Sequence, residues 1–206
     1  MALNSASQVF IPQPVLSLDE IIRQILVSEV DYYVKGGKAF NYYYAMDPVP
    51  TVDWDIVAFP YTSISIGSKL SELSMKKLEW NGEIFLATSF TQSMETFLDN
   101  DQTYSTVVTY HINDHPIMDI ILTDDIQDQD IEIGTDGIRY LIKPLLMMDV
   151  RRTLDARIEL SKTPSKKSKT RRKRSEKLLR NKQRMERIDK YKGKRRSVKG
   201  KKRMDY

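Results

Sequence analysis

The sequence predicts an α+β domain, a mixed sheet flanked by helices, followed by a basic and partly helical C-terminal tail. Three observations predict it. A capped amphipathic helix lies near the start of the chain. A double glycine is separated by fifteen residues from an Asp-x-Asp strand. The chain also changes from acidic to basic near residue 162, which sets the tail apart from the domain.

The first half of the chain alternates between helix and strand signals. Ser17 and Glu20 fit a capping box, and apolar residues then recur at helical spacing. The expected elements are a helix over 18–31, a strand over 32–35, a helix over 38–44, a strand over 53–59, a strand over 61–66 and a helix over 69–77.

The second half is richer in strands. Alternating and β-branched residues predict a strand over 83–89 and a hairpin of residues 103–112 and 116–122, joined by an Asn-Asp turn. Residues 137–160 have a mostly helical pattern, which Pro144 should break or kink because proline removes a helical hydrogen bond.

The Asp-x-Asp strand carries candidate metal ligands. Asp53 and Asp55 point to the same face of a strand, about 6.5 Å apart at Cα. Carboxylates in this arrangement suit Mg²⁺, which prefers one or two carboxylates together with substrate phosphates. Gly36 and Gly37 have no Cβ, so their N–H groups can approach phosphates closely, and a helix that starts near Lys38 adds its positive end.

A third carboxylate is expected from a later strand. Asp119 is the single acid in the middle of an otherwise apolar strand, where an acid is costly to bury without a partner or a metal. Its oxygens should lie within about 6 Å of those of Asp53 or Asp55 if metals are shared. Each signal alone has an ordinary interpretation. The double glycine could be only a turn, the Asp-x-Asp segment a solvated strand end or loop, and Asp119 an acid on an edge strand that faces water. Their combination in this order favours a common site.

Residues 35–42 and 52–56 together resemble the poly(A) polymerases of poxviruses and other large DNA viruses, which have the nucleotidyltransferase fold. The resemblance implies Asp53, Asp55 and Asp119 as catalytic metal ligands for Mg²⁺ or Mn²⁺. It also implies Gly36, Gly37 and Lys38 as the segment that binds the nucleotide phosphates. The viral enzymes are much longer and have further domains for the base and the RNA. A protein partner could supply such a domain here.

The charge of the chain is divided unequally. Residues 1–161, the expected nucleotidyltransferase-like domain, contain 11 Lys/Arg and 24 Asp/Glu. Residues 162–206, the expected basic tail, contain 22 Lys/Arg and 4 Asp/Glu. Such a tail is typical of a segment that binds RNA or DNA phosphates. The alternatives are a solvated tail, or a tail that docks on an acidic surface, including the chain's own domain.

Composition excludes several classes of function. The chain has no cysteine, so it has neither disulfides nor a cysteine-ligated zinc site. The sequence shows no apolar run of membrane-spanning length and no secretory signal pattern, so we expect an intracellular location, in a host cytoplasm or a virion if the protein is viral.

Two functions follow from the sequence. One is a template-independent nucleotidyltransferase that uses a nucleoside triphosphate and a divalent metal. The other is a catalytically inactive protein of the same fold that binds nucleic acid or serves as a virion component.

Overall fold

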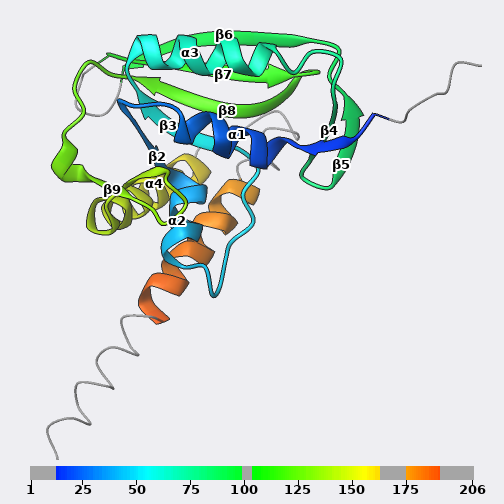
Figure 1. Cartoon of the computed structure of the whole chain (residues 1–206). Helices are drawn as coiled ribbons and strands as arrows, with labels where there is room; N and C mark the ends of the chain where they lie inside the picture. The colour runs from blue at the N-terminus through cyan, green and yellow to red at the C-terminus, as the bar shows by residue number, and fades with distance from the viewer. Residues whose placement is uncertain (1–12, 99–103, 163–174, 191–206) are drawn as a thin grey trace, which may run out of the picture.

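The computed structural model describes residues 13–98, 104–162 and 175–190 of the chain, and it confirms the α+β class (Figure 1). The larger sheet has seven strands in the order β6-β7-β8-β3-β2-β10-β9. In that order the strands are β6 (Phe90–Leu98), β7 (Tyr104–Ile112), β8 (His115–Leu122), β3 (Trp54–Ala58), β2 (Tyr32–Lys35), β10 (Arg139–Leu141) and β9 (Ile131–Ile133). A single 3₁₀ turn, Asp128–Asp130, precedes β9.

The sheet is mixed at its centre. Strand β3 pairs in parallel with β8 and antiparallel with β2, while β6, β7 and β8 form an antiparallel meander. Asn113 and Asp114 both have positive φ (48° and 63°), which makes the β7–β8 connection the expected two-residue hairpin turn. Strand β6 was not predicted, because its side chains are almost all exposed and its sequence has no apolar alternation.

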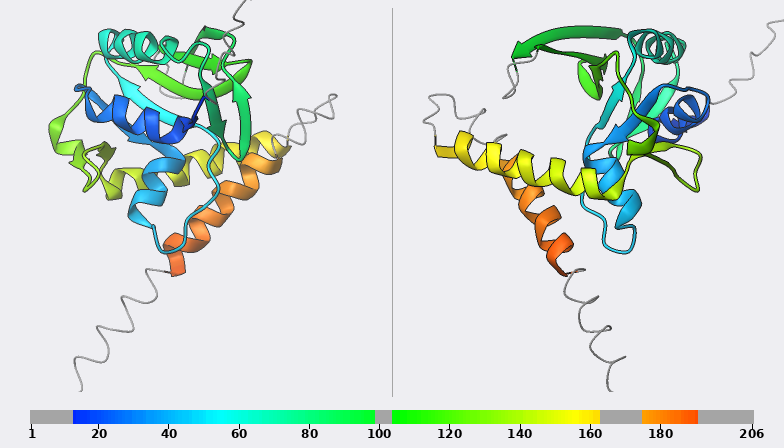
Figure 2. Two further views of the ribbon diagram at one scale, coloured as in Figure 1. Left: turned by 45° about the vertical axis from the view of Figure 1, so that its right-hand side comes forward. Right: turned by 90° about the vertical axis from the view of Figure 1, so that its left-hand side faces the viewer.

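Helices lie on both sides of this sheet (Figure 2). Helices α1 (Leu18–Val27) and α3 (Pro60–Ser71) cover one face, and α4 (Lys143–Lys162) lies on the opposite side. Helix α2 (Gly36–Tyr43) directly follows β2. Ser17 caps α1 as predicted, by accepting a bond from the N–H of Glu20 at 3.4 Å, although α1 ends earlier than expected.

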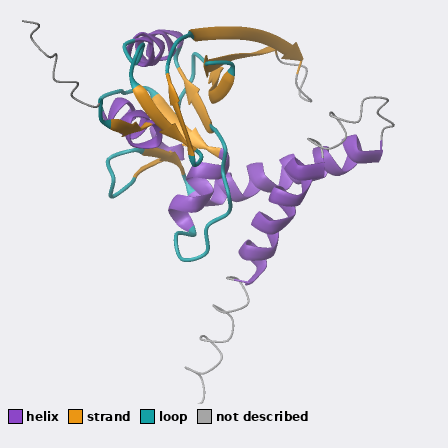
Figure 3. Cartoon of the chain, turned by 90° about the vertical axis from the view of Figure 1, so that its right-hand side faces the viewer, coloured by secondary structure: helices purple, strands orange, loops and turns teal. Residues whose placement is uncertain are grey.

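A second, three-stranded sheet lies beside α1. It consists of β1 (Val15–Ser17), β4 (Lys77–Trp80) and β5 (Glu83–Leu86), in the order β1-β4-β5 (Figure 3). Asn81 and Gly82 connect β4 to β5 with φ values of 53° and 84°, as a type I′ turn requires. The buried side chains Leu78 and Trp80 of this sheet join the main core.

The structure corrects the expected elements at three places. The helical pattern expected over 137–160 begins at Lys143, because Arg139–Leu141 form strand β10. The strand expected over 61–66 and the start of the helix expected over 69–77 form the single helix α3, which begins with Pro60, ends at Ser71 and buries Thr62, Ile66 and Leu70 four residues apart. Residues 72–75 form turns, and Lys77 begins β4. The β-branched residues of α3 resemble a strand, but the apolar spacing is helical. Pro144 does not break α4, because it lies in the first turn, where its missing N–H has no helical partner.

Part of the predicted tail packs on the domain. Residues 175–190 form a helix, here called the 175–190 helix, whose Ile188 is buried in the main core and whose Met185 packs against that core. Its basic residues Arg187 and Lys190 pair with Asp47 at 3.0 and 3.2 Å. These contacts agree, for residues 175–190, with the alternative that the tail docks on the chain's own domain. The expected linker and the last basic segment, 163–174 and 191–206, lie outside the described residues, so the domain boundary at 161 stays a prediction.

No helix among the described residues is long and apolar enough to span a membrane.

Candidate active site

Four adjacent strands place polar side chains in one row across the larger sheet. Lys35 on β2 is the register partner of Asp55 on β3, Asp55 is the partner of Asp119 on β8, and Asp119 is the partner of Thr109 on β7. Register partners on neighbouring strands lie about 5 Å apart and point to the same face. The sheet therefore brings together residues that are far apart in the sequence.

The three predicted carboxylates converge. One carboxylate oxygen from each of Asp53, Asp55 and Asp119 lies within 4.8 Å of the other two, which confirms the predicted proximity. Asp53 precedes β3 and does not belong to the strand itself. Thr109 Oγ1 donates a hydrogen bond to Asp119 Oδ1 at 2.7 Å, which orients this carboxylate. An all-oxygen cluster of this kind could hold a hard divalent cation such as Mg²⁺ or Mn²⁺.

Gly36 of the double glycine faces this cluster, whereas Gly37 faces the side chains of Thr51 and Arg184. Gly36 has a φ of +63°, and a Cβ at this position would overlap Oδ2 of Asp55. Gly36 and Gly37 form the first turn of α2, so the helix begins two residues before the predicted start at Lys38. The positive end of the α2 dipole therefore lies beside Asp55.

The Lys38 side chain does not face the carboxylates. Its Nζ forms an ion pair with Asp19 of α1 and lies 4.9 Å from the ring centroid of Trp54 and 5.6 Å from that of Trp80. Trp54 alternates with Asp55 along β3 and points to the opposite face of the sheet, where its Nε1 donates to Asp19 Oδ1 at 3.0 Å. The ammonium group of Lys38 is thus engaged by Asp19 and lies beside two tryptophan rings, and the expectation that Lys38 takes part in phosphate binding stays a prediction. This lysine stabilises the contact between α1, α2 and the sheet.

Burial raises the pKa of the Asp55 carboxyl to about 6, and the negative charge of Asp53 adds to this effect. Lys35 and Arg184 oppose it, whereas Asp119 contributes a further, smaller increase. The charges of Lys35 and Arg184 are therefore too weak to cancel the rise in the pKa of Asp55 that burial and the neighbouring acids cause. A bound divalent cation would stabilise the ionised form of all three carboxylates, so the residues fit a metal.

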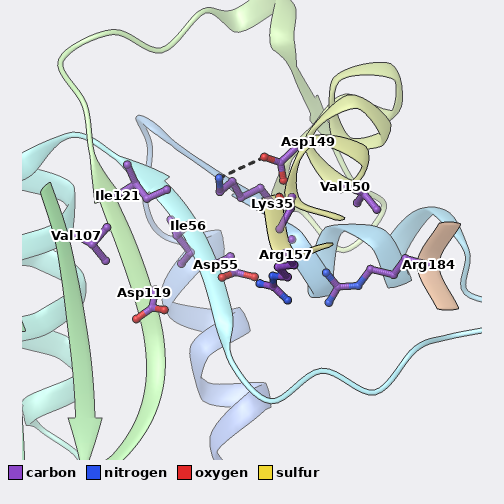
Figure 4. A pocket seen from close by; sticks show the side chains of 12 residues that line it. Lys35, Asp55, Ile56, Val107, Asp119, Ile121, Asp149, Val150, Arg157 and Arg184 are labelled. Atoms are coloured by element: carbon purple, nitrogen blue, oxygen red, sulfur yellow. Dashed lines mark ion pairs between the residues drawn. The ribbon is translucent and has the colours of Figure 1, made fainter. Parts of the chain in front are cut away.

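A cavity of about 200 Å³ opens over the row of polar side chains (Figure 4). It is bounded by the sheet, by the start of α2, by one face of α4 and by the 175–190 helix; the lining residues are Lys35, Gly36, Asp55, Ile56, Val107, Asp119, Ile121, Asp149, Val150, Thr153, Arg157 and Arg184. Lys35 Nζ forms an ion pair with Asp149 Oδ1 at 3.6 Å, which ties β2 to α4.

Two arginines of this cavity were not identified from the sequence. Figure 4 shows the side chains of Arg157 and Arg184 reaching toward Asp55 from two different helices. Burial lowers the pKa of each, and the nearby charge of Asp55 opposes that change. The spacing of Asp149, Thr153 and Arg157 on α4 was an available signal, because residues four apart lie on one helical face. Arg184 was counted as a tail residue, since nothing in the sequence indicates which surface its helix meets.

No protein-family model matches the sequence, and no curated protein matches it. Among solved structures, the chain is similar to the Megavirus polyadenylate synthase, with a TM-score of 0.44 and 15% sequence identity. The similarity covers 70% of this chain but 30% of the viral protein, so the chain spans less than a third of that protein. A likeness of this size bears on neither the chemistry nor the substrates of the chain.

Proposed function

We propose that this protein is a metal-dependent nucleotidyltransferase that adds nucleotides to the 3′ end of a nucleic acid without a template, as poly(A) polymerases do. The observation that carries the proposal is the convergence of Asp53, Asp55 and Asp119 within 4.8 Å, beside the N-terminus of α2. The motif resemblance of residues 35–42 and 52–56 to viral poly(A) polymerases supports the same reading.

Each element of the site has a role in this proposal. Asp53, Asp55 and Asp119 would hold Mg²⁺ or Mn²⁺, and the metal would supply charge neutralisation at the phosphoryl oxygens. Gly36 and Gly37 allow the phosphates to approach the backbone N–H groups of α2. Thr109 keeps the Asp119 carboxylate oriented, since a hydrogen-bonded ligand has less freedom to rotate.

The nucleic acid would bind through basic residues of the segment 162–206. Within the described part of this segment, Lys177 and Lys182 of the 175–190 helix have exposed side chains that form no ion pair with another described residue, whereas the exposed Lys190 pairs with Asp47. Contacts of lysine with phosphates carry no sequence information, so the acceptor would bind without strong sequence preference. A partner protein would provide the surface for the base. We expect the protein to act inside a cell or a virion.

The test is incorporation of labelled nucleotide into RNA and DNA oligonucleotides with Mg²⁺ or Mn²⁺. Wild-type protein should extend an acceptor, and Asp53→Ala should abolish extension while leaving thermal unfolding unchanged. Asp128→Ala is the matched control, because the Asp128 side chain is 98% exposed and does not line the cavity, so it should keep full activity.

A second candidate is an inactive protein of this fold that binds nucleic acid or serves as a virion component. The size of the cavity favours it, because about 200 Å³ is below the roughly 300–1,000 Å³ of a pocket that encloses a whole small-molecule ligand. No incorporation from any of the four triphosphates, on RNA or DNA, would support this candidate over the enzyme.

A further inference from the structure

Arg157 and Arg184 bring two positive charges into the cavity without a carboxylate within ion-pair distance among the described residues. Arg157 Nη1 donates to the backbone oxygen of Lys177 at 3.0 Å, and Arg184 Nη1 donates to Asn181 Oδ1 at 3.4 Å. The Nε of Arg184 is buried and has no hydrogen-bond partner in the described part of the chain. Most of the donor capacity of the two guanidinium groups is therefore unused.

The surroundings of Arg184 disfavour a cation. A Cβ at Gly37 would lie 2.6 Å from Arg184 Nη2, so the guanidinium packs against the first turn of α2, which is the positive end of the helix dipole. The charge of Arg157 further lowers the pKa of Arg184. Asp55 in the same cavity offsets part of the repulsion among the two guanidinium groups and the helix N-terminus, and an anion between the arginines would remove the rest.

We infer that Arg157 and Arg184 bind the terminal phosphates of a nucleoside triphosphate, which makes the 175–190 helix a substrate-binding element of the site. The identity of the triphosphate rests on the proposed function, whereas the polyphosphate chemistry rests on the arginines. Guanidinium groups form paired hydrogen bonds with phosphate oxygens, and the cavity is large enough for the phosphate end while the nucleoside stays outside.

This binding couples the ligand to the position of the helix. Arg157 belongs to α4 and Arg184 to the 175–190 helix, so a phosphate held by both connects these two elements. A ligand that binds only the docked form stabilises docking by mass action. The 175–190 helix thus has two faces, with Arg184 turned toward the cavity and Lys182 turned toward solvent.

The test is binding of inorganic tripolyphosphate to the full-length protein in EDTA, measured by calorimetry. Arg157→Gln and Arg184→Gln should each weaken binding by about 10–100-fold, the loss expected for charge-assisted hydrogen bonds. Lys182→Gln removes one charge from the exposed face of the same helix and should change binding by less than about twofold. If all three variants lose affinity equally, or if none does, the inference is overturned.

A second measurement needs no variant. Tripolyphosphate at about ten times its dissociation constant should slow hydrogen exchange in residues 175–190 of the wild-type protein by about tenfold. Unchanged exchange with tripolyphosphate bound overturns the inference, even if Arg184→Gln undocks the helix.

Two further comparisons are needed. The first distinguishes binding of nucleic-acid phosphates from binding of a polyphosphate, and the second distinguishes phosphate binding from the proposed nucleotide transfer. If the arginine variants lose binding of a single-stranded oligonucleotide but keep tripolyphosphate, the arginines read nucleic acid and the inference fails. If tripolyphosphate binding depends on both arginines while wild-type protein incorporates no nucleotide, the inference stands and the proposed transfer activity fails.

Discussion

Asp55 and Asp119 are register partners on the adjacent parallel strands β3 and β8. A shift of either strand by one residue would turn its aspartate to the opposite face of the sheet. The buried neighbours Trp54, Ile56 and Ile120 stabilise the observed register, because a shift by one residue would turn them away from the core. Packing on one face of the sheet therefore positions the carboxylates on the other.

Gly36→Ala should lower the free energy of unfolding by about 2–4 kcal/mol and weaken Mn²⁺ binding. The positive φ costs about 1 kcal/mol for alanine, and the new Cβ would also displace the Asp55 carboxylate. Gly82→Ala is the control, since Gly82 also has a positive φ but open space around it. Urea unfolding and Mn²⁺ titration measure both effects. Equal losses of stability in the two variants, with Mn²⁺ affinity retained, would show that Gly36 is needed only for its backbone conformation.

Thr109→Val should reduce the affinity for Mn²⁺ by about 10–100-fold, because it removes the hydrogen bond that orients Asp119. Thr106→Val is the matched control on the same strand, where the hydroxyl bonds only to Thr96 among the described residues. Calorimetric titration of both variants checks the prediction. A control that loses as much affinity as Thr109→Val would assign the effect to the strand and not to Asp119.

Asp55→Asn should stabilise the metal-free protein at pH 8 but not at pH 3. The folded-state pKa of about 6 lies above the value of 3.8 for an unperturbed carboxyl, so the folded state binds the proton more tightly. Stability therefore falls as pH rises from about 4 to about 6, and the full cost, at most about 3 kcal/mol, is present above pH 7.

Urea unfolding in EDTA at pH 3 and pH 8 should show a higher free energy of unfolding for Asp55→Asn at pH 8, because the substitution removes the cost of ionising Asp55. Asp128→Asn serves as the exposed control and should show no such gain. A stabilisation of Asp55→Asn that is equal at pH 3 and pH 8 would contradict the proposed cause.

Ile188→Ala should loosen the 175–190 helix from the domain. The Ile188 side chain is 1% exposed, and its truncation should cost about 2–5 kcal/mol of packing free energy. Leu179→Ala on the same helix is the control, because Leu179 is 57% exposed. Hydrogen exchange should accelerate in residues 175–190 for Ile188→Ala alone. Similar exchange in both variants would argue against docking through Ile188.

Much of the site could be predicted because its signals are local. The Asp-x-Asp strand alternates faces whatever surrounds it, and the double glycine marks a close approach of the backbone. Asp119 stood out because an acid in an apolar strand needs a partner. The position of the Lys38 side chain could not be predicted, since the sequence does not show that Asp19 of α1 pairs with its ammonium group.

The sequence by itself determined the class of the fold, the two-residue spacing of Asp53 and Asp55 and the acidic and basic parts of the chain, because these depend on residue type and periodicity. Tertiary packing determined the rest. It put Asp119 beside Asp55 through the pairing of β3 with β8, and it brought Arg184 into the cavity through the burial of Ile188. Such contacts join residues that are distant along the chain, and their energy depends on complementary surfaces that no local pattern specifies.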